Sequence, residues 1–436
     1  MRRLRVLTVL TAALGWLVIG APFTAGADGS AINSGDTAWL LVATALVMIM
    51  LPGLALFYGG LVRRKNVLST IMHSFFGLAL VSVVWVLVGF SIAFAPDVNG
   101  MGLIGGFNYV GFMNVGLEPS TVYMTTVPFV LFAAFQLMFA AITPALITGA
   151  FAERKRFASF VIFTILWSIF VYSPIAHWVW ASDGWLFKLG ALDFAGGTVV
   201  HASSGVSALI VALLIGRRVV NGDSMEPHDI PMTVLGAGLL WFGWFGFNAG
   251  SAGAANGLAA NALLVTNTAA AAATITWVLA SYLHKGKVSV VGAACGAVAG
   301  LVAITPASGF VTAGGALIIG LVVGGLCYSA TLLRSRLKID DALDVFAVHG
   351  VGGTFGAIAT GVFATAAINA YPGLIDGNAG QVVTQLIAVS ATIAYAVVAT
   401  FGIVKLVDVI LGLRISARDE EMGIDLSTHG EVAYQP

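Results

Sequence analysis

The sequence predicts an all-α integral membrane protein with eleven transmembrane helices, arranged as a five-plus-five inverted repeat followed by one long C-terminal helix. Three observations carry this prediction: the composition, the succession of apolar runs, and the side on which basic residues lie. Of 436 residues, 59% are hydrophobic and only 9% are charged, whereas a soluble domain carries about 25% charged residues. The formal net charge is +0, so no nucleic-acid partner is expected.

The chain begins with a segment typical of a secretory signal peptide. A basic stretch at residues 2–5 precedes an apolar run at 6–19 and a small-residue cleavage site, Ala25-Gly26-Ala27. An uncleaved first membrane helix is the alternative, but the run breaks at Pro22 before it reaches the ~20 residues that a span needs. We therefore expect a cleaved signal peptide at 1–27, a membrane domain at 28–413 and a tail at 414–436.

Apolar runs long enough to span a bilayer then follow one another, separated by short polar breaks. We expect helices at 37–62, 67–95, 123–150, 157–181, 197–216, 231–249, 258–284, 288–306, 312–333, 345–366 and 381–412.

Basic residues predict how these helices are oriented. Alternate loops carry thirteen lysines and arginines, at positions 63–65, 154–156, 217–218, 285, 287, 334, 336 and 338. The opposite loops carry only Lys188. The positive-inside rule places the basic side in the cytoplasm. We expect a multi-pass protein of the inner (plasma) membrane whose mature N-terminus is outside and whose C-terminal tail is cytoplasmic.

Two short sequence echoes support the repeat. Residues 141–145 (Ala-Ile-Thr-Pro-Ala) recur at 303–307, and the Ala-Leu-Asp that ends at Asp193 recurs ending at Asp344. Each echo joins helices that would be partners in the two halves. Inverted repeats of this kind place a substrate pathway at the interface between them.

Two histidines occupy matched positions in these halves. His201 and His349 lie within the last helix of each repeat, each shortly after an aspartate and each followed by small residues. A lone buried histidine usually has a structural role, which is what we expect of His73 and His177. A pair related by a pseudo-two-fold axis instead predicts two imidazoles that meet near the midplane, where they can accept and donate protons.

Aromatic residues suggest a second element of the pathway. Phe135 and Phe139 lie one turn apart, Trp180 ends the fourth helix, and the run 247–251 reads Phe-Asn-Ala-Gly-Ser at the outer end of the sixth. Each aromatic residue alone is more often an interfacial anchor. Clustered with a hydroxyl group, they could hold a small cation through cation–π attraction, worth ~2 kcal/mol or more when desolvated.

Several long motifs together resemble the ammonium transporter (Amt/Mep/Rh) family, and its bacterial Amt members in particular. They are residues 52–60 (Pro-Gly-Leu-Ala-Leu-Phe-Tyr-Gly-Gly), 193–201, 243–251 and 344–350, which match in order and spacing. The similarity extends from about residue 33 into the tail.

The resemblance implies a homotrimer in which each subunit has its own narrow hydrophobic pore. It implies an outer ammonium site formed by Trp180, Phe139 and Ser251, and a gate of Phe139 stacked on Phe247. It also implies pore-lining histidines, His201 and His349, and a supporting carboxylate, Asp193. Phe135 and Gln136 match positions next to the pore. One extra residue between Trp180 and Asp193 departs from the family pattern. The tail resembles the region that accompanies binding of a P-II nitrogen-regulatory protein in bacterial members.

The resulting hypothesis is transport of ammonium or ammonia: capture at the outer aromatic site, deprotonation, and passage of ammonia along the histidines. Two alternatives stay open. One is transport of another small amine or neutral solute on the same fold, and the other is an ammonium sensor that acts through its tail. We do not expect an enzyme, because the sequence shows no motif for paired catalytic carboxylates, a metal-ligand cluster or a nucleotide-binding loop. No cofactor or metal is expected either.

Overall fold

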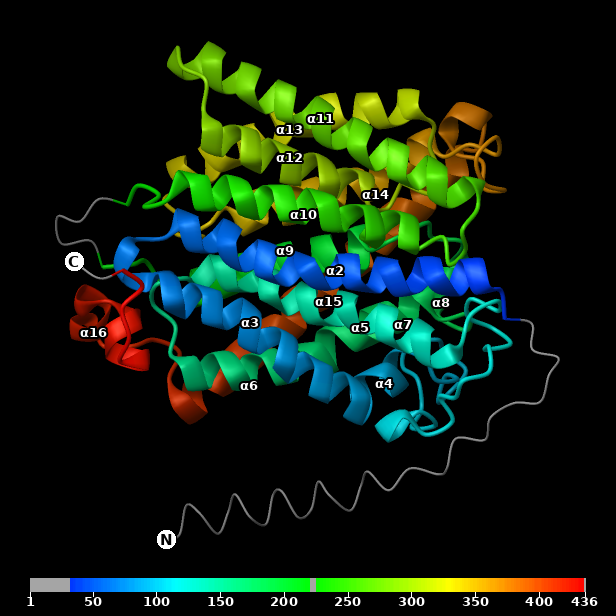
Figure 1. Ribbon diagram of the computed structural model, residues 1–436, viewed down its shortest axis with the longest axis horizontal. Helices are drawn as coiled ribbons and strands as arrows, with labels where there is room; N and C mark the ends of the chain where they lie inside the picture. The colour runs from blue at the N-terminus through cyan, green and yellow to red at the C-terminus, as the bar shows by residue number, and fades with distance from the viewer. Residues whose placement is uncertain (1–31, 220–224, 435–436) are drawn as a thin grey trace, which may run out of the picture.

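The computed structural model describes residues 32–219 and 225–434. The signal peptide expected at residues 1–27 therefore lies outside the described residues. All the named secondary-structure elements in the described part are helices, which confirms the all-α class. Figure 1 shows the long helices running side by side along the horizontal axis.

The first half of the bundle contains five membrane-crossing segments, several of which change helix type along their length. They are α2 (Ser34–Leu61); α3 (Val67–Val84) with η2 (Trp85–Gly89) and α4 (Phe90–Phe94); α5 (Phe129–Ile147) with η4 (Thr148–Phe151); α6 (Phe157–Trp167) with η5 (Ser168–Tyr172) and α7 (Ser173–Trp180); and η6 (Gly197–Ala202) with α9 (Ser203–Ile215).

The second half repeats this order and ends with the longest helix. It consists of α10 (Ile230–Gly250), α11 (Gly257–Lys285), α12 (Val290–Ile304), α13 (Ala313–Arg336), η7 (Phe346–Val351) with α14 (Gly352–Phe363), and α15 (Ala379–Leu411). Short helices outside the bundle are η1 (Arg64–Asn66), η3 (Val110–Phe112), α8 (Trp185–Leu189), η8 (Leu374–Asp376), α16 (Ala417–Met422) and η9 (Asp425–His429).

Helices occur at all eleven predicted positions, and ten of them are long and apolar enough to cross a membrane among the residues searched, so the eleventh membrane span stays a prediction. The other is α12, with 15 residues. At 1.5 Å per residue it extends roughly 22 Å, less than the ~30 Å hydrocarbon layer. The third helix begins at Phe129 rather than at the predicted 123. Pro128 caps it, and the residue before a proline is disfavoured in helical conformation.

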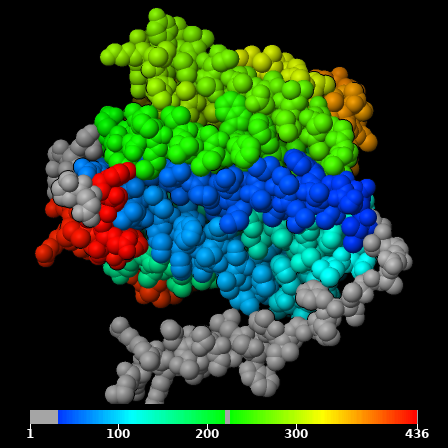
Figure 2. Space-filling view, in the orientation of Figure 1, coloured from blue at the N-terminus to red at the C-terminus, as the bar shows by residue number. Residues whose placement is uncertain are grey.

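The two halves meet along their first helices. Figure 2 shows α2 and α10 adjacent across one face of the molecule. Gly236 of α10 allows this approach, because a Cβ there would lie 2.2 Å from the backbone nitrogen of Phe57 in α2. Small residues let membrane helices pack at such short distances. The interface between the halves is thus a tight backbone contact, and the functional site lies beside it.

The bundle has two distinct ends, visible at opposite sides of Figure 1. The basic end carries the loops between α2 and α3 and between η4 and α6, the described residues that follow α9 and precede α10, and the C-terminal tail with α16. The Trp180 end carries α4, α7, α8 and the long connection at residues 95–128. The tail is anchored on the basic end, where the Asp425 carboxylate accepts hydrogen bonds from the backbone N–H groups of Leu68 (3.0 Å) and Ser69 (2.8 Å).

Candidate functional site

His201 and His349 meet in the centre of the bundle. Their Nδ1 atoms are 3.2 Å apart, and the rings are stacked with centroids 5.3 Å apart. Both side chains are buried, with relative exposures of 1% and 4%. His201 comes from η6 and His349 from η7, which occupy the same place in the two halves.

The contact between the rings constrains their protons. Two Nδ1–H donors could not hydrogen-bond each other, so one Nδ1 carries the proton and the other accepts it. The accepting ring must then carry its own proton on Nε2 if it is neutral. The Nε2 atom of His201 is buried and has no hydrogen-bond partner among the described residues. The pair can therefore hand a proton between rings or hydrogen-bond to a small guest.

Both histidines lie in short π-helical turns. Such wide turns are rare and frequently occur at functional sites. The amide of His201 donates to the carbonyl oxygen of Gly196 (3.0 Å), five residues earlier, and Gly196 has φ +121°, a conformation that favours glycine. The residue after it, Gly197, packs against Pro306. A Cβ added at Gly197 would lie 2.4 Å from the pyrrolidine ring of Pro306. The local sequence thus has glycines where the turn needs them.

Asp193 holds the start of the His201 helix. Its carboxylate accepts hydrogen bonds from the backbone N–H groups of Gly196, Gly197, Thr198 and Val199, at 2.6–3.2 Å, and from the Thr198 hydroxyl. Burial raises the pKa of Asp193, and the Thr198 hydroxyl and these amides oppose that rise. Its backbone carbonyl accepts the indole N–H of Trp180 at 2.9 Å. One residue therefore connects the Trp180 end with the histidine pair.

An unbroken series of rings connects Trp180 to the histidines. Trp180 meets Phe139 edge-on with centroids 5.9 Å apart, Phe139 lies 4.3 Å from Phe247, and Phe247 stacks on His201 at 6.0 Å. Phe135 extends the series sideways, 4.9 Å from Phe139. Four segments far apart in the sequence supply these rings, and the fold brings them into one line.

Two predicted residues lie next to this line rather than in it. Ser251 follows Phe247 by one turn, and its hydroxyl donates to the Phe247 carbonyl at 2.8 Å. It is half-buried at the end of α10. Gln136 is buried on α5, and its Oε1 has no partner within the described part of the chain. Both therefore retain a lone pair for a guest.

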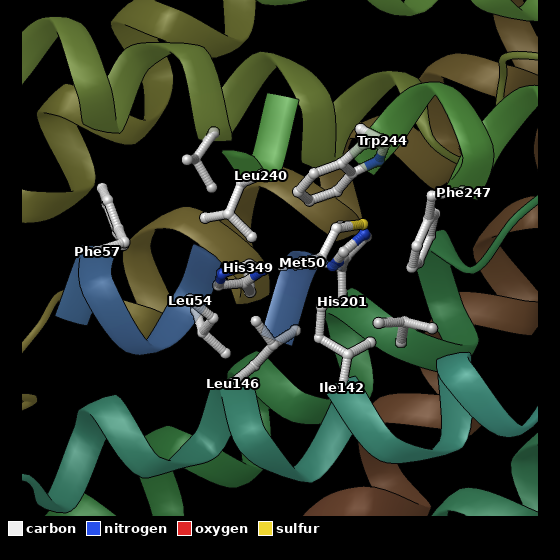
Figure 3. A pocket seen from close by; sticks show the side chains of 12 residues that line it. Met50, Leu54, Phe57, Ile142, Leu146, His201, Leu240, Trp244, Phe247 and His349 are labelled. Carbon is white, nitrogen blue, oxygen red and sulfur yellow. Dashed lines mark hydrogen bonds between the residues drawn. The ribbon is translucent and has the colours of Figure 1, made fainter. Parts of the chain in front are cut away.

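A small chamber surrounds the histidine pair. Its volume is about 10 Å³, and all of its twelve lining residues except the two histidines are hydrophobic. In Figure 3, Phe247, His201, His349 and Phe57 follow one another across the chamber. A space of this size holds about one water-sized molecule. None of the lining residues bears a fixed charge, so an ion inside would find only the imidazoles as polar partners.

Trp244 is a site residue that the sequence reasoning missed. It lines the chamber, its ring stacks on His201 at 5.4 Å, and its indole N–H donates to the Thr305 hydroxyl at 2.8 Å. Its position in the sequence could have indicated this, because Trp244 precedes Phe247 by three residues and so lies on the same face of the helix.

The pairing of Asp344 with Asp193 from the sequence echo is wrong. Asp341, not Asp344, stands eight residues before His349, as Asp193 stands eight before His201. Asp341 also caps its helix, accepting the Phe346 N–H at 2.7 Å. Asp344 instead forms an ion pair with Arg334 at 2.5 Å. The repeated Ala-Leu-Asp is thus offset by three residues between the two halves, and its aspartates do not occupy equivalent positions.

No cluster of three or more metal-ligating side chains occurs within residues 32–219 and 225–434. The polar groups at the site are instead imidazole, amide, hydroxyl and indole.

A family model described as the Ammonium Transporter Family matches residues 38–434. An ammonium transporter of Bacillus subtilis (strain 168) is 50% identical over 407 residues, covering 93% of this chain and 99% of the relative. The crystal structure of Saccharomyces cerevisiae Mep2 matches with a TM-score of 0.84 and 41% identity, covering 89% of this chain and 88% of that one. A solved structure described as a sensor Amt protein matches with a TM-score of 0.82 and 30% identity, covering 90% and 98%.

Proposed function

This chain belongs to the ammonium transporter family, and from that membership we propose that it carries ammonium or ammonia across a membrane through its own central pathway. The observation that supports this most is the continuous line from Trp180 through Phe139 and Phe247 to the histidine pair. The line ends in a chamber of about 10 Å³. A pathway of that size and chemistry suits a very small guest that can exchange a proton.

In this proposal, Trp180, Phe139 and Ser251 capture ammonium at the Trp180 end. The faces of the two rings attract the cation, and the Ser251 oxygen accepts one of its hydrogen bonds. Asp193 does not touch the ion but holds the Trp180 indole through its backbone carbonyl. Phe135 and Gln136 neighbour the entrance. Phe139 and Phe247 form the gate, because their ring centroids are 4.3 Å apart and leave no open passage between the rings.

Ammonia then enters the chamber without its proton. An intact cation there would lose its hydration without meeting a carboxylate or a ring of carbonyl oxygens. Ammonia is neutral, and it can donate to and accept from His201 and His349. The proton either follows through the imidazole pair, which makes transport electrogenic, or remains on the side of entry.

Selectivity against potassium follows from the same physics. Potassium resembles ammonium in size and charge but has no proton to lose. The chamber offers it nothing to replace its hydration shell, so the full cost of desolvating a charge remains. A fixed negative charge at the histidine pair would reduce that cost.

We further propose the orientation and the assembly. The basic end faces the cytoplasm in the inner (plasma) membrane, after a cleaved signal peptide has placed the mature N-terminus outside. The subunits form a homotrimer, each with its own pore. The anchored tail at the basic end suits a P-II nitrogen-regulatory protein as partner.

The test is charge movement across proteoliposomes after an ammonium pulse, with a potassium pulse as control and the His201→Ala/His349→Ala double variant alongside. A current specific to ammonium that the double variant lacks is expected for an electrogenic transporter that uses the pair. Internal alkalinisation without current would identify a neutral ammonia channel. His201→Asp is expected to admit potassium, and complete exclusion of potassium by that variant would contradict the selectivity argument.

An ammonium sensor is the second candidate, and the match to a sensor Amt protein favours it. A sensor needs the capture site and the tail but little flux. Absence of both current and alkalinisation, together with an ammonium-dependent change in the protease sensitivity of the tail, would select this candidate over transport.

A further inference from the structure

The two histidine helices cross at a pair of glycines. Gly205 follows His201 by four residues and Gly353 follows His349 by four, so each glycine lies one turn beyond the histidine of its own helix. Each glycine faces the segment that carries the opposite histidine. The arrangement is reciprocal, as the repeat symmetry requires.

Gly205 touches the segment that carries His349. A Cβ at position 205 would lie 2.0 Å from the backbone nitrogen of Gly350, 2.4 Å from its Cα and 2.7 Å from the carbonyl carbon of His349. Unbonded heavy atoms prefer about 3.5–4.0 Å. These are backbone atoms and cannot rotate away, so any side chain at 205 must push the His349 turn outward.

Gly353 touches the segment that carries His201. A Cβ at position 353 would lie 2.7 Å from the Cβ of His201 and 2.9 Å from the backbone nitrogen of Ala202. The conflict is milder than at Gly205, but the nearest atom here is the side-chain Cβ of the histidine. A side chain here must displace His201 directly.

We propose that Gly205 and Gly353 are positioning residues for the histidine pair: the missing Cβ at each one sets the separation of His201 and His349, and so the ability of the pair to pass ammonia. This inference rests on the proposed transport function and adds two residues to it. The Nδ1 atoms are 3.2 Å apart, near the upper end of hydrogen-bond length. A displacement on the order of 1 Å would break that contact, and misplacement of this size can cost ~100-fold in rate.

The capture site lies in other segments, which gives the inference a distinctive kinetic signature. Trp180, Phe139 and Ser251 belong to α7, α5 and the end of α10. A shift of the histidines should therefore lower the maximal rate and leave the ammonium concentration for half-maximal rate nearly unchanged. A general loss of folded protein would lower the amount of active transporter without changing the rate per molecule.

Two other glycines provide matched controls. Gly320 of α13 is packed more tightly than Gly353 and less tightly than Gly205, with a Cβ placed 2.4 Å from the Ala269 carbonyl oxygen of α11, but it lines no part of the chamber. Gly238 of α10 has open space around its Cβ position. Gly320→Ala measures the cost of a helix clash away from the histidines, and Gly238→Ala measures the substitution without a clash.

The experiment compares Gly205→Ala, Gly353→Ala, Gly320→Ala and Gly238→Ala with the unchanged chain in proteoliposomes. Ammonium flux is normalised to the monodisperse folded protein in each sample. We expect at least a tenfold lower maximal rate for Gly205→Ala, a smaller loss for Gly353→Ala, and half-saturation within twofold of the unchanged chain for both. Equal rates per folded molecule for Gly205→Ala, Gly353→Ala and Gly320→Ala would overturn the proposal.

If Gly205→Ala yields no folded protein, Gly353→Ala decides by the same criterion. If the unchanged chain carries no ammonium, the proposed function fails and the inference is tested by structure alone. An experimental structure of Gly353→Ala should show the two Nδ1 atoms more than 3.5 Å apart, and an unchanged separation would overturn the inference.

Discussion

The two aspartates that begin the histidine helices occupy equivalent positions but have different surroundings. Asp193 accepts five hydrogen bonds, from four backbone amides and the Thr198 hydroxyl. Asp341 accepts one well-formed hydrogen bond, from the Phe346 amide at 2.7 Å, with a weaker contribution from the Val345 amide, and its other oxygen is buried with no hydrogen-bond partner among the described residues. Asp193 lies toward the Trp180 end and Asp341 toward the basic end.

The surroundings of each carboxyl act on its pKa. Burial raises the pKa of both carboxyls. At Asp341 the charge of Asp344 adds to burial, and the Phe346 amide opposes it, so the pKa is raised to about 6. Asp193 has many more donors to stabilise its anion. The same capping position therefore holds a carboxylate with many hydrogen-bond donors in one half, Asp193, and a carboxylate with few donors in the other, Asp341.

The largest expected effect is at Asp193. Asp193→Ala leaves four backbone amides and a hydroxyl without their acceptor, and hydrogen bonds to charged groups contribute ~1.5–3 kcal/mol each. We expect the thermal midpoint in detergent to fall much further than for Asp341→Ala, which loses one hydrogen bond and at the same time relieves the burial of a charge. Ammonium flux should fall too, because the Trp180 contact and the His201 turn depend on this residue.

Equal falls in thermal midpoint for the two alanine variants would show that the number of hydrogen bonds at each aspartate does not determine its contribution to stability. Asp193→Asn serves as the conservative control. This variant keeps one acceptor oxygen. Its thermal midpoint should therefore lie between that of the alanine variant and that of the unchanged chain.

The next effect concerns pH at Asp341. Its folded-state pKa of about 6 exceeds the ordinary value of 3.8, so the folded protein binds the proton more tightly than the unfolded chain. Its contribution to stability should therefore rise as pH falls from about 7 toward 4. Asp341→Asn keeps an acceptor for Phe346 but cannot ionise. We expect this variant to be more stable at pH 8, on the order of 3 kcal/mol.

The neighbouring Asp340 is the matched control, because its pKa is shifted the other way. Burial opposes its ionisation, but the hydrogen bonds and charge of Arg218, together with Arg154, outweigh burial and lower its pKa to about 2. Its contribution is present above about pH 4 and is lost as pH falls toward 2. Asp340→Asn should thus be less stable than the unchanged chain at pH 7. Thermal midpoints that changed in the same direction for both variants would contradict this assignment.

The smallest effect is expected at Thr198, whose hydroxyl is the one side-chain donor to Asp193 among these contacts. Thr198→Val removes that hydrogen bond and keeps the shape of the side chain. Loss of this one bond costs ~1.5 kcal/mol, the low end of the range for hydrogen bonds to charged groups. The measurement is the thermal midpoint, and Thr360→Val, which loses only a bond to its own helix backbone, is the control. A fall no larger than that of Thr360→Val would mean that the four amides suffice.

Most of the fold could be predicted from the sequence, because lipid demands long apolar helices with few charges. The helix positions followed from hydropathy alone. The ends were less certain, since they depend on local caps such as Pro128, and helix length depends on contacts that hydropathy does not record, as α12 shows. The π-helical turns at η6 and η7 leave no mark in apolar periodicity.

The site was partly predictable for a different reason. The repeat placed His201 and His349 in partner helices, and their contact follows from that symmetry. Trp244 was overlooked because an apolar residue in an apolar helix gives no contrast. Asp341 was overlooked because the Ala-Leu-Asp echo pointed three residues too far along. The roles of the capture and gate residues stay predictions, since geometry alone does not measure transport.

The small volume of the chamber has a consequence for osmotic balance. A space of about 10 Å³ walled mainly by carbon leaves a chain of water molecules too few hydrogen-bond partners to stay continuous. Bulk water would then not follow the guest through the protein. A cell could fill its membrane with many copies of such a transporter and neither swell nor shrink faster because of them.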